Sequence, residues 1–410
     1  MKKSGKLWII GILVCLEIFF LPRQVWAEGE VQEPENLYAL SAVLMDGDSG
    51  RILFGKNEKE QRPMASTTKV MTCILVLESG KLEETAKTSS YAASMPEVHM
   101  GAREGETYRV RDLLYALMLE SYNDAAVILA EHIAGSTEGF ADKMNEKARK
   151  IGCTDTWFIT PNGLDAQEET EEGVKIHSTT AEDLARILRY CIKESSAREE
   201  FLKITRTPAY TFTDTAGAKT ISCTNHNAFL NMMEGALTGK TGFTSDAGYC
   251  YVGALERDGK TLIVALLGCG WPNNKNYKWS DTRKLMEYGL ENYNWQSFAE
   301  ETLPQMPQYL PVEGGRTQIL GTSAQVKLTL EDISQEEGLL LRKDEKLEVT
   351  CRLEEELRAP VKAGEKTGEI LYQLDGETLK TRGIYTADDV EKIDFSWCLE
   401  ETLKRLAFAG

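Results

Sequence analysis

The stretch Pro63-Met64-Ala65-Ser66-Thr67-Thr68-Lys69 stands just ahead of the apolar run Cys73-Ile74-Leu75-Val76-Leu77. A leading proline suits a helix entry because it has no backbone N–H to donate. The pattern predicts a helix from about Ala65 to Ser79, in which residues three apart, such as Ser66 and Lys69, share one face. Ser66 would lie in the first turn, where unpaired N–H groups and the helix dipole favour a developing negative charge.

This spacing suits a nucleophile with its own base. A serine hydroxyl attacks only when a base takes its proton, and a lysine is that base only when burial or nearby positive charge lowers its pKa. The competing interpretation is a Ser/Thr-rich helix start with a solvated lysine, since about one or two S-x-x-K matches arise by chance in a chain this long. The choice between the two depends on the rest of the chain.

The first 27 residues predict an export signal. Lys2, Lys3 and Lys6 precede an apolar run, Leu7–Leu21, and a small residue, Ala27, stands at the expected cleavage point. The alternative is an uncleaved membrane anchor, but the run is short for a membrane span. We therefore expect a mature chain that begins at Glu28 and acts outside the cytoplasm, in the cell wall or at the outer face of the cytoplasmic membrane.

Net charge excludes two classes of partner. The whole chain carries a formal charge of −17, and removing the signal, whose own charge is +3, makes it −20. Such a chain lacks the basic surface that binds nucleic acid phosphates, and its net charge does not attract an anionic membrane. The nine cysteines show no metal-site spacing, so we expect neither a metal nor a cofactor.

Strand, helix and strand patterns follow one another through the first 295 residues. A turn at Asp46–Gly50 between apolar runs predicts a hairpin, and the helix carrying Ser66 comes next. The middle of the chain has helical periodicity, and a three-strand antiparallel meander follows it. The expected segments are helices at Tyr108–Leu119, from about Ala125, at Gly139–Ile151, Thr180–Lys193 and Ser280–Asn292, and meander strands starting near Gly235, Tyr249 and Thr261.

The chain changes character near residue 296. Pro304, Pro307 and Pro311 suggest a linker, and short alternating runs such as Gln325–Leu330 and Leu347–Cys351 predict a small all-β domain. The last residues place apolar side chains at helical spacing. The predicted division is a signal peptide at 1–27, a main domain at 28–295, a small β domain at 296–390 and an amphipathic helix at 391–410.

Three short elements occur in order: Ser66-x-x-Lys69, Ser121-x-Asn123 and Lys240-Thr241-Gly242. K-T-G alone would arise about once in ten chains of this length, so all three at a helix start, an inter-helix loop and a strand favour a functional interpretation. The set resembles that of β-lactamases and penicillin-binding proteins. With Pro161-Asn162-Gly163-Leu164-Asp165 and Phe243-Thr244, it looks like the D-alanyl-D-alanine carboxypeptidases, the low-molecular-weight penicillin-binding proteins.

The resemblance implies an α+β fold: a β-lactamase/transpeptidase-like domain, with an antiparallel sheet, flanking helices and an inserted helical cluster, plus a small C-terminal all-β domain. It implies a serine peptidase that removes the terminal D-alanine from peptidoglycan stem pentapeptides through an acyl-enzyme. β-Lactams would be covalent inhibitors. The C-terminal helix would be a possible peripheral membrane contact, although packing against the protein's own β domain is equally compatible with its mixed polar face.

Roles for individual residues also follow from the resemblance. Ser66 would be the nucleophile, Lys69 its base and Ser121 the proton relay to the leaving amine. The substrate-binding residues would be Asn123 at the substrate amide, Lys240 and Thr241 of the Lys240-Thr241-Gly242 motif at the terminal carboxylate, and Phe243, whose backbone N–H would form an oxyanion hole with that of Ser66. Lys278 falls roughly where the family places an arginine near that carboxylate.

Two alternatives stay open at this point. A β-lactamase uses the same fold, although the glutamate pattern E-x-x-L-N of its best-known class does not occur in this chain. A non-catalytic peptidoglycan-binding or β-lactam-sensing module is the other. His99, His132, His177 and His226 form no triad-like arrangement with Ser66, so we expect them to be ordinary, and we expect the acidic run Glu168–Glu172 to be a solvated loop.

Overall fold

The computed structural model describes residues 31–171, 173–317 and 321–408. The predicted signal peptide at 1–27 lies outside the described residues. Every helix and strand below belongs to the unit Glu33–Gly410.

The main domain is built on a five-stranded antiparallel sheet in the order β2-β1-β11-β10-β9. The last three strands are sequential neighbours, so the expected meander is confirmed. Lys240 on β9 stands opposite Val252 on β10, and Thr241 stands opposite Tyr251. The strands are β1 (Ser41–Asp46), β2 (Ile52–Lys56), β9 (Ala236–Thr244), β10 (Gly248–Arg257) and β11 (Lys260–Leu267).

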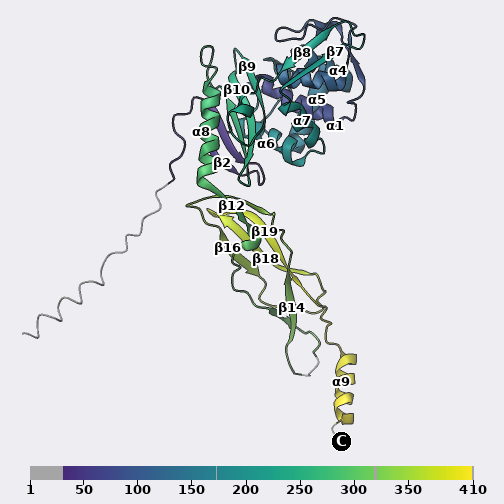
Figure 1. The fold of residues 1–410 in the computed structure, drawn as a ribbon. Helices are drawn as coiled ribbons and strands as arrows, with labels where there is room; N and C mark the ends of the chain where they lie inside the picture. Colours follow the sequence, from purple (N-terminus) through teal and green to yellow (C-terminus); the bar gives the residue numbers. More distant parts are fainter. Residues whose placement is uncertain (1–30, 172, 318–320, 409–410) are drawn as a thin grey trace, which may run out of the picture. The chain divides into compact units, whose positions relative to one another are not determined.

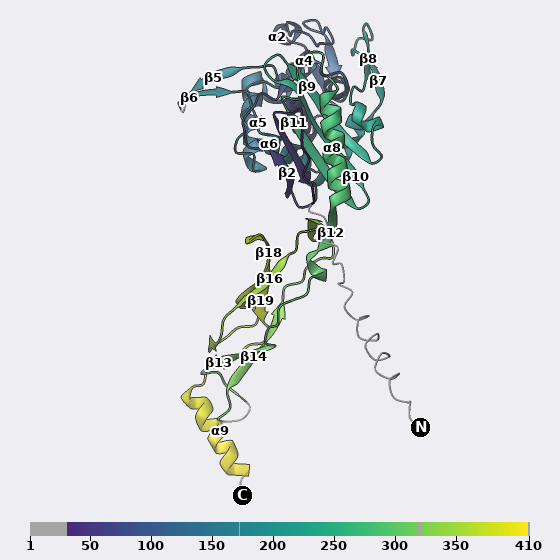
Figure 2. The same cartoon turned by 90° about the vertical axis from the view of Figure 1, so that its left-hand side faces the viewer.

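Helices cover both faces of the sheet. As a consequence, every residue of the central strand β11 is buried. A strand buried on both faces is apolar throughout rather than alternating, and the segment Leu262–Leu267 is an unbroken apolar run. Both α6 (Ala181–Arg189) and α8 (Tyr277–Asn292) pack against β1, β10 and β11. Figures 1 and 2 show α8 running along the strands.

The inserted helical cluster surrounds α1 (Lys69–Glu78), which contacts α4, α5, α6 and α7. Most α1 side chains are buried, in agreement with a helix that is apolar around most of its circumference. The predicted helix start is different in detail, because Ala65–Thr68 forms a 3₁₀ turn and the α-helix begins only at Lys69. The other helices are α2 (Ser90–Ala93), α3 (Val110–Tyr115), α4 (Asn123–Ala134), α5 (Thr137–Lys150) and α7 (Arg198–Arg206).

Two predicted helices end in π-helical turns, at Ala116–Glu120 after α3 and at Tyr190–Glu194 after α6. Such turns occur often at functional sites, and the first of them leads directly into Ser121. The helix after that site begins at Asn123, two residues before the expected start.

The main domain also carries small two-stranded antiparallel sheets. They are β3 (Thr85–Lys87) with β4 (Thr107–Arg109), which are joined through α2, and the hairpins of β5 (Gln167–Thr170) with β6 (Gly173–Ile176) and β7 (Ala209–Thr213) with β8 (Thr220–Thr224). The prediction of a loop at Glu168–Glu172 was wrong for Glu168 and Glu169, which lie on β5 and pair with Lys175 and Val174. Pairing with β6 holds this segment as a strand, which the charge pattern alone did not indicate.

The C-terminal region contains a six-stranded sheet in the order β16-β18-β19-β14-β13-β17, so the predicted all-β domain is confirmed. Pro311 lies inside β13 rather than in a linker. β12 (Tyr293–Ser297), which spans the expected boundary, pairs with β15 (Gly338–Arg342). The remaining elements are β13 (Tyr309–Glu313), β14 (Ala324–Leu330), β16 (Glu348–Leu353), β17 (Leu357–Arg358), β18 (Lys366–Leu374), β19 (Glu377–Thr386) and α9 (Phe395–Phe408).

Candidate active site

Ser66 and Lys69 meet at the junction of the 3₁₀ turn and α1. The Nζ atom of Lys69 lies 2.8 Å from Ser66 Oγ, 2.9 Å from Asn123 Oδ1 and 2.6 Å from the carbonyl oxygen of Asn162. Asn123 Nδ2 donates to the carbonyl of Pro96, which leaves its Oδ1 facing the lysine. The two asparagine oxygens can only accept hydrogen bonds. A neutral amine therefore donates its two hydrogens to them and keeps its lone pair for the hydroxyl of Ser66.

The surroundings of Lys69 favour this neutral form. Its side chain is fully buried, and burial, followed by the nearby Lys240, lowers the lysine pKa well below its ordinary value, while Asp124 opposes the shift. The Asp124 carboxylate is itself occupied by the backbone N–H groups of Met100 and Ala102, both at 3.0 Å. A lysine whose pKa is lowered in this way can act as a general base.

Ser121 is placed by an unusual backbone conformation. Its φ angle is +66°, in the left-handed region that non-glycine residues rarely occupy. Ala65, the residue before the nucleophile, has φ +48°. Such backbone conformations cost about 1–3 kcal/mol each and cluster at active sites. They lie at or beside the two serines, Ser66 and Ser121, that line the same cavity.

The edge strand β9 forms the opposite wall. Lys240 Nζ donates to Ser121 Oγ at 3.0 Å and to the carbonyl of Thr241 at 2.9 Å. Burial lowers the pKa of Lys240 to about 7. Gly242 lets the strand approach the 3₁₀ turn closely, since a Cβ there would lie 2.8 Å from the nitrogen of Ser66. This approach packs the β9 backbone at Gly242 directly against the backbone of Ser66 and Thr67.

These residues surround a cavity of about 600 Å³. Ser66, Ser121, Asn123, Thr241, Gly242 and Phe243 all line it, whereas Lys69 and Lys240 lie buried behind its wall. Lys278 lines it too, with its Nζ 4.7 Å from the ring centre of Tyr249 and 4.8 Å from that of Trp279. Burial lowers the pKa of Lys278 to about 8.

Sequence reasoning missed His226 and Asn162. His226 was expected to be ordinary but lines this cavity, with its Nε2 2.8 Å from Glu120 Oε2. Asn162 contributes its backbone carbonyl to Lys69, and a backbone atom leaves no signature in residue type. The stretch Pro161-Asn162-Gly163 has a turn composition and contributes to the family resemblance, but neither observation places its backbone beside Lys69.

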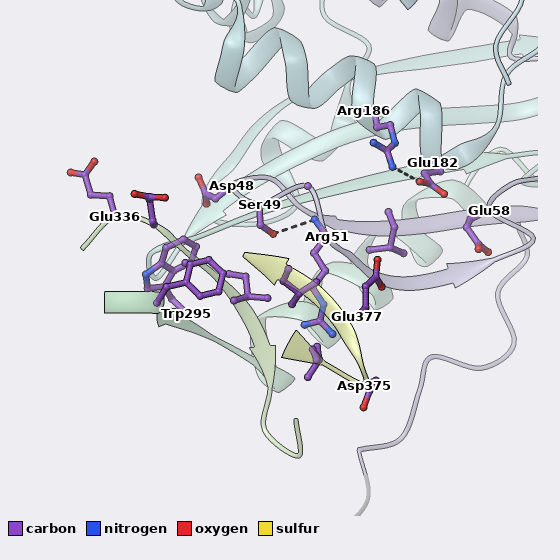
Figure 3. Close-up of a pocket in the computed structure, with 18 of the residues that line it drawn as sticks. Asp48, Ser49, Arg51, Glu58, Glu182, Arg186, Trp295, Glu336, Asp375 and Glu377 are labelled. Carbon is purple, nitrogen blue, oxygen red and sulfur yellow. Dashed lines mark hydrogen bonds and ion pairs between the residues drawn. The ribbon is translucent and has the colours of Figure 1, made fainter. Parts of the chain in front are cut away.

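A separate cavity of about 910 Å³ lies beside the turn between β1 and β2, and Figure 3 shows its wall. Carboxylates of Glu58, Glu336 and Glu377 face it, together with the ring of Trp295. The guanidinium of Arg51 is already bound to Glu345 at 2.6 and 2.9 Å. Its lining includes Ser49 and Lys59, but the hydroxyl of Ser49 donates to Asp46 Oδ2 at 2.5 Å. Volume alone therefore does not identify the reactive site.

The geometry of the smaller cavity defines a class of enzyme. A serine in contact with a buried lysine whose pKa is lowered, together with a second buried lysine in the β9 wall, is an arrangement suited to serine acyl transfer. The site therefore indicates a serine hydrolase.

Comparison with known proteins gives the family. The D-alanyl-D-alanine carboxypeptidase family matches residues 28–270, and the chain belongs to this family. A second match, to the C-terminal domain of penicillin-binding protein 5, covers residues 308–392. The chain is 28% identical to D-alanyl-D-alanine carboxypeptidase DacF of Bacillus subtilis over 98% of both chains. It is 31% identical to DacD of Escherichia coli over 84% of both chains.

Solved structures agree with this placement. Penicillin-binding protein 5 from Haemophilus influenzae is 26% identical, with a TM-score of 0.67, over 88% of this chain and all of that one. Penicillin-binding protein D2 from Listeria monocytogenes, solved in an ampicillin-bound form, is 31% identical over 63% of this chain and all of that one, with a TM-score of 0.53. The predicted fold class is confirmed, and the protein is a serine-type D-alanyl-D-alanine carboxypeptidase.

Proposed function

We propose that the enzyme removes the terminal D-alanine from peptidoglycan stem pentapeptides, with Ser66 as the nucleophile. Ser66 Oγ attacks the carbonyl carbon of the penultimate D-alanine while its proton passes to Lys69 Nζ. The backbone N–H groups of Ser66 and Phe243 stabilise the oxyanion that forms. The observation that supports this proposal most directly is the 2.8 Å contact between Ser66 Oγ and a buried lysine whose pKa is lowered.

The leaving group then departs as D-alanine. Its nitrogen takes a proton through the hydroxyl of Ser121, the C–N bond breaks, and the acyl chain remains as an ester on Ser66. Asn123 holds the substrate amide in this proposal. A water molecule then hydrolyses the ester and regenerates the serine.

Cationic side chains on the β9 side would bind the substrate's terminal carboxylate. Lys240 and Thr241 lie there in the β9 wall, and Lys278, held between two aromatic rings, adds a further positive charge at the same cavity. Lysine lacks the bidentate fork of arginine. We therefore propose that Lys278 attracts the substrate carboxylate as a point charge, while Thr241 orients that carboxylate.

The cavity disfavours the β-lactamase alternative. Rapid release of a penicilloyl group needs a second base that drives water onto the ester, a glutamate in the best-known class. Among the described lining residues the one carboxylate is Glu97, and Glu168 on the β5 strand instead accepts a hydrogen bond from the indole of Trp157 at 2.6 Å. We propose that β-lactams acylate Ser66 and leave slowly, because their leaving amine stays tethered and obstructs water.

We also propose that the enzyme is exported and works in the cell wall or at the outer face of the cytoplasmic membrane. The basic and apolar pattern of residues 1–27 supports this, as does the peptidoglycan substrate. In the described part of the chain, no helix is both long and apolar enough to cross a membrane.

Substitution of Ser66 tests the proposal. Ser66→Ala should eliminate D-alanine release from a stem pentapeptide and the mass increase that benzylpenicillin gives in intact-mass spectrometry, with unchanged thermal unfolding. Ser94→Ala, at an exposed serine, is the matched control and should retain both activities. D-Alanine release by the Ser66→Ala protein above trace level would contradict the assignment of the nucleophile. Rapid turnover of penicillin by the wild type would instead favour the β-lactamase alternative.

A further inference from the structure

Among the four histidines, His177 lies deepest in the structure and closest to the catalytic lysine. Its side chain is 1% exposed. One ring nitrogen, Nε2, lies 2.8 Å from Thr68 Oγ1, and Thr68 immediately precedes Lys69 in the chain. The other, Nδ1, accepts hydrogen bonds from the backbone N–H groups of Ile159 at 2.9 Å and Thr160 at 3.3 Å.

These contacts determine the tautomer. Two backbone N–H groups point at Nδ1, so this atom must carry a lone pair, and the ring proton must be on Nε2, which donates to Thr68. Protonation of Nδ1 would place an N–H group against two others. Burial, with a smaller contribution from Lys69, lowers the pKa of His177 to about 3. The ring is therefore neutral at pH values well above 3.

The backbone held by His177 leads directly to the catalytic amine. Ile159 and Thr160 enter the turn whose Asn162 carbonyl accepts a hydrogen bond from Lys69 Nζ at 2.6 Å. The same turn is fixed to α1 by Thr72 Oγ1, which donates to the carbonyl of Pro161 at 2.6 Å. At Gly163, where φ is +86°, a Cβ would lie 2.0 Å from the carbonyl oxygen of Ala65.

We propose that His177 is a positioning residue for Lys69. It joins Thr68, at the base of the catalytic lysine, to the turn that presents the Asn162 carbonyl. That carbonyl takes one of the two hydrogens of the neutral amine, and so directs the lone pair of the amine at Ser66. Loss of the His177 contacts would let the turn at Asn162 move. The amine of Lys69 would then lose its orientation toward Ser66, and water could enter beside it. The proposal rests on Lys69 being the base, as proposed above.

Two amide substitutions of His177 test its two contacts separately, the one to the turn at Ile159 and Thr160 and the one to Thr68. The amide of asparagine reaches about as far as Nδ1 of histidine, so His177→Asn can still accept from Ile159 and Thr160. The longer glutamine reaches about as far as Nε2, so His177→Gln can keep the bond to Thr68 but not the bond to the turn. His132→Asn, on α4 where the histidine pairs with Glu84, is the matched control for a histidine remote from the site.

The readouts are acylation by benzylpenicillin and D-alanine release, each measured against pH. His177→Gln should lower the acylation rate and kcat by ~10–100-fold, in the range expected for a misplaced catalytic group, with KM nearly unchanged because the carboxylate-binding residues are untouched. The acidic limb of its rate profile should move to higher pH, since water beside Lys69 raises the pKa of the lysine. His177→Asn should recover most of the rate, and His132→Asn should match the wild type.

Equal rates and equal pH profiles for the wild type and both His177 variants would overturn the proposal. If the variants do not fold, the imidazole ¹⁵N shifts of the wild type supply the test. A proton on Nδ1, or titration of His177 between pH 5 and 9, would overturn the proposal as well. Because acylation is scored separately from D-alanine release, a wild type that is acylated but releases no D-alanine would count against the stem-peptide function and not against the role of His177.

Discussion

Lys69 and Lys240 need opposite charge states in the mechanism proposed above. As the base, Lys69 must be neutral, whereas Lys240, which binds the substrate carboxylate in that proposal, must be charged. Burial lowers both pKa values, that of Lys69 well below its ordinary value and that of Lys240 to about 7. The hydrogen bonds of Lys240 to Ser121 and Thr241 use neutral acceptors, so no carboxylate in these contacts compensates for burial of its charge.

This difference predicts a pH dependence of substrate capture. As pH rises through about 7, free enzyme loses the proton of Lys240, so kcat/KM for a D-Ala-D-Ala peptide should fall. In the complex, the bound carboxylate raises the lysine pKa, so kcat should fall only at higher pH. Measurement of both profiles from pH 5 to 10 checks this. A kcat/KM value that stays constant between pH 7 and 9 would show that the Lys240 charge is not needed.

At the scale of single residues, the motifs S-x-x-K, S-x-N and K-T-G indicated side chains that the structure gathers at one cavity. Their roles in the reaction are those proposed above. The carbonyl of Asn162 and the ring of His177 were not predictable. Their contribution depends on contacts across 93 and 109 residues of the chain with Lys69 and Thr68, respectively, and neither residue type distinguishes this role from an ordinary one.

Close packing of β9 on the 3₁₀ turn brings Lys240 near Ser66 and Lys69. The sequence periodicity predicted that helices and strands occur in these regions, but it did not predict the local backbone conformations at the site. The 3₁₀ turn at Ala65–Thr68, the π-helical turn at Ala116–Glu120 and the left-handed Ser121 are local conformations that tertiary packing imposes. They depart from sequence preference at the positions where a reactive side chain has to face the cavity.

Gly242→Ala tests the importance of the close approach. Its Cβ would lie 2.8 Å from the nitrogen of Ser66 and 3.0 Å from that of Thr67, so the strand must shift away from the turn. Separation of the two oxyanion-hole N–H groups should lower the acylation rate by ~10²–10³-fold, the usual cost of losing one such donor. Stopped-flow acylation by a chromogenic cephalosporin measures this effect.

Gly55→Ala is the matched control for Gly242→Ala. Gly55 lies on β2 of the same sheet, and the atoms nearest to its Cβ would belong to the side chain of Glu58, which can move. This variant should acylate at the wild-type rate. Wild-type acylation by Gly242→Ala with an intact fold would contradict the requirement for close approach, and equal losses in both variants would indicate a general effect on the sheet.

The whole chain combines the catalytic domain with a β domain and a terminal helix, α9, which exposes several large apolar side chains. Phe395, Leu399, Leu403 and Leu406 are between 49% and 81% exposed. The start of α9 is tied to the β domain by the ion pair between Arg316 and Asp394 at 2.7 Å, but the apolar stripe beyond it is not covered by the described residues. This exposure favours the membrane-contact alternative over packing against the β domain.

The charge of α9 determines what kind of membrane binding to expect. Glu400 and Glu401 balance Lys404 and Arg405, and both glutamates pair with Lys404. The helix thus has no basic face to attract anionic lipid, and the chain as a whole is strongly acidic. Burial of the apolar stripe, at about 25 cal/mol per Å² of apolar surface, has to supply the binding free energy.

We therefore expect the mature protein to bind neutral phosphatidylcholine vesicles at least as well as vesicles containing phosphatidylglycerol, with little dependence on salt. Truncation after Val390 should abolish flotation with vesicles, and Leu403→Glu should weaken it strongly, because a charge in the middle of the stripe must be desolvated. Thr402→Glu, at the neighbouring exposed position, adds the same charge outside the apolar stripe. This control should weaken flotation less than Leu403→Glu does. Equal flotation of the truncated and full-length proteins would show that α9 is not the membrane contact. D-Alanine release by the truncated protein in solution is the control that its catalytic domain remains intact.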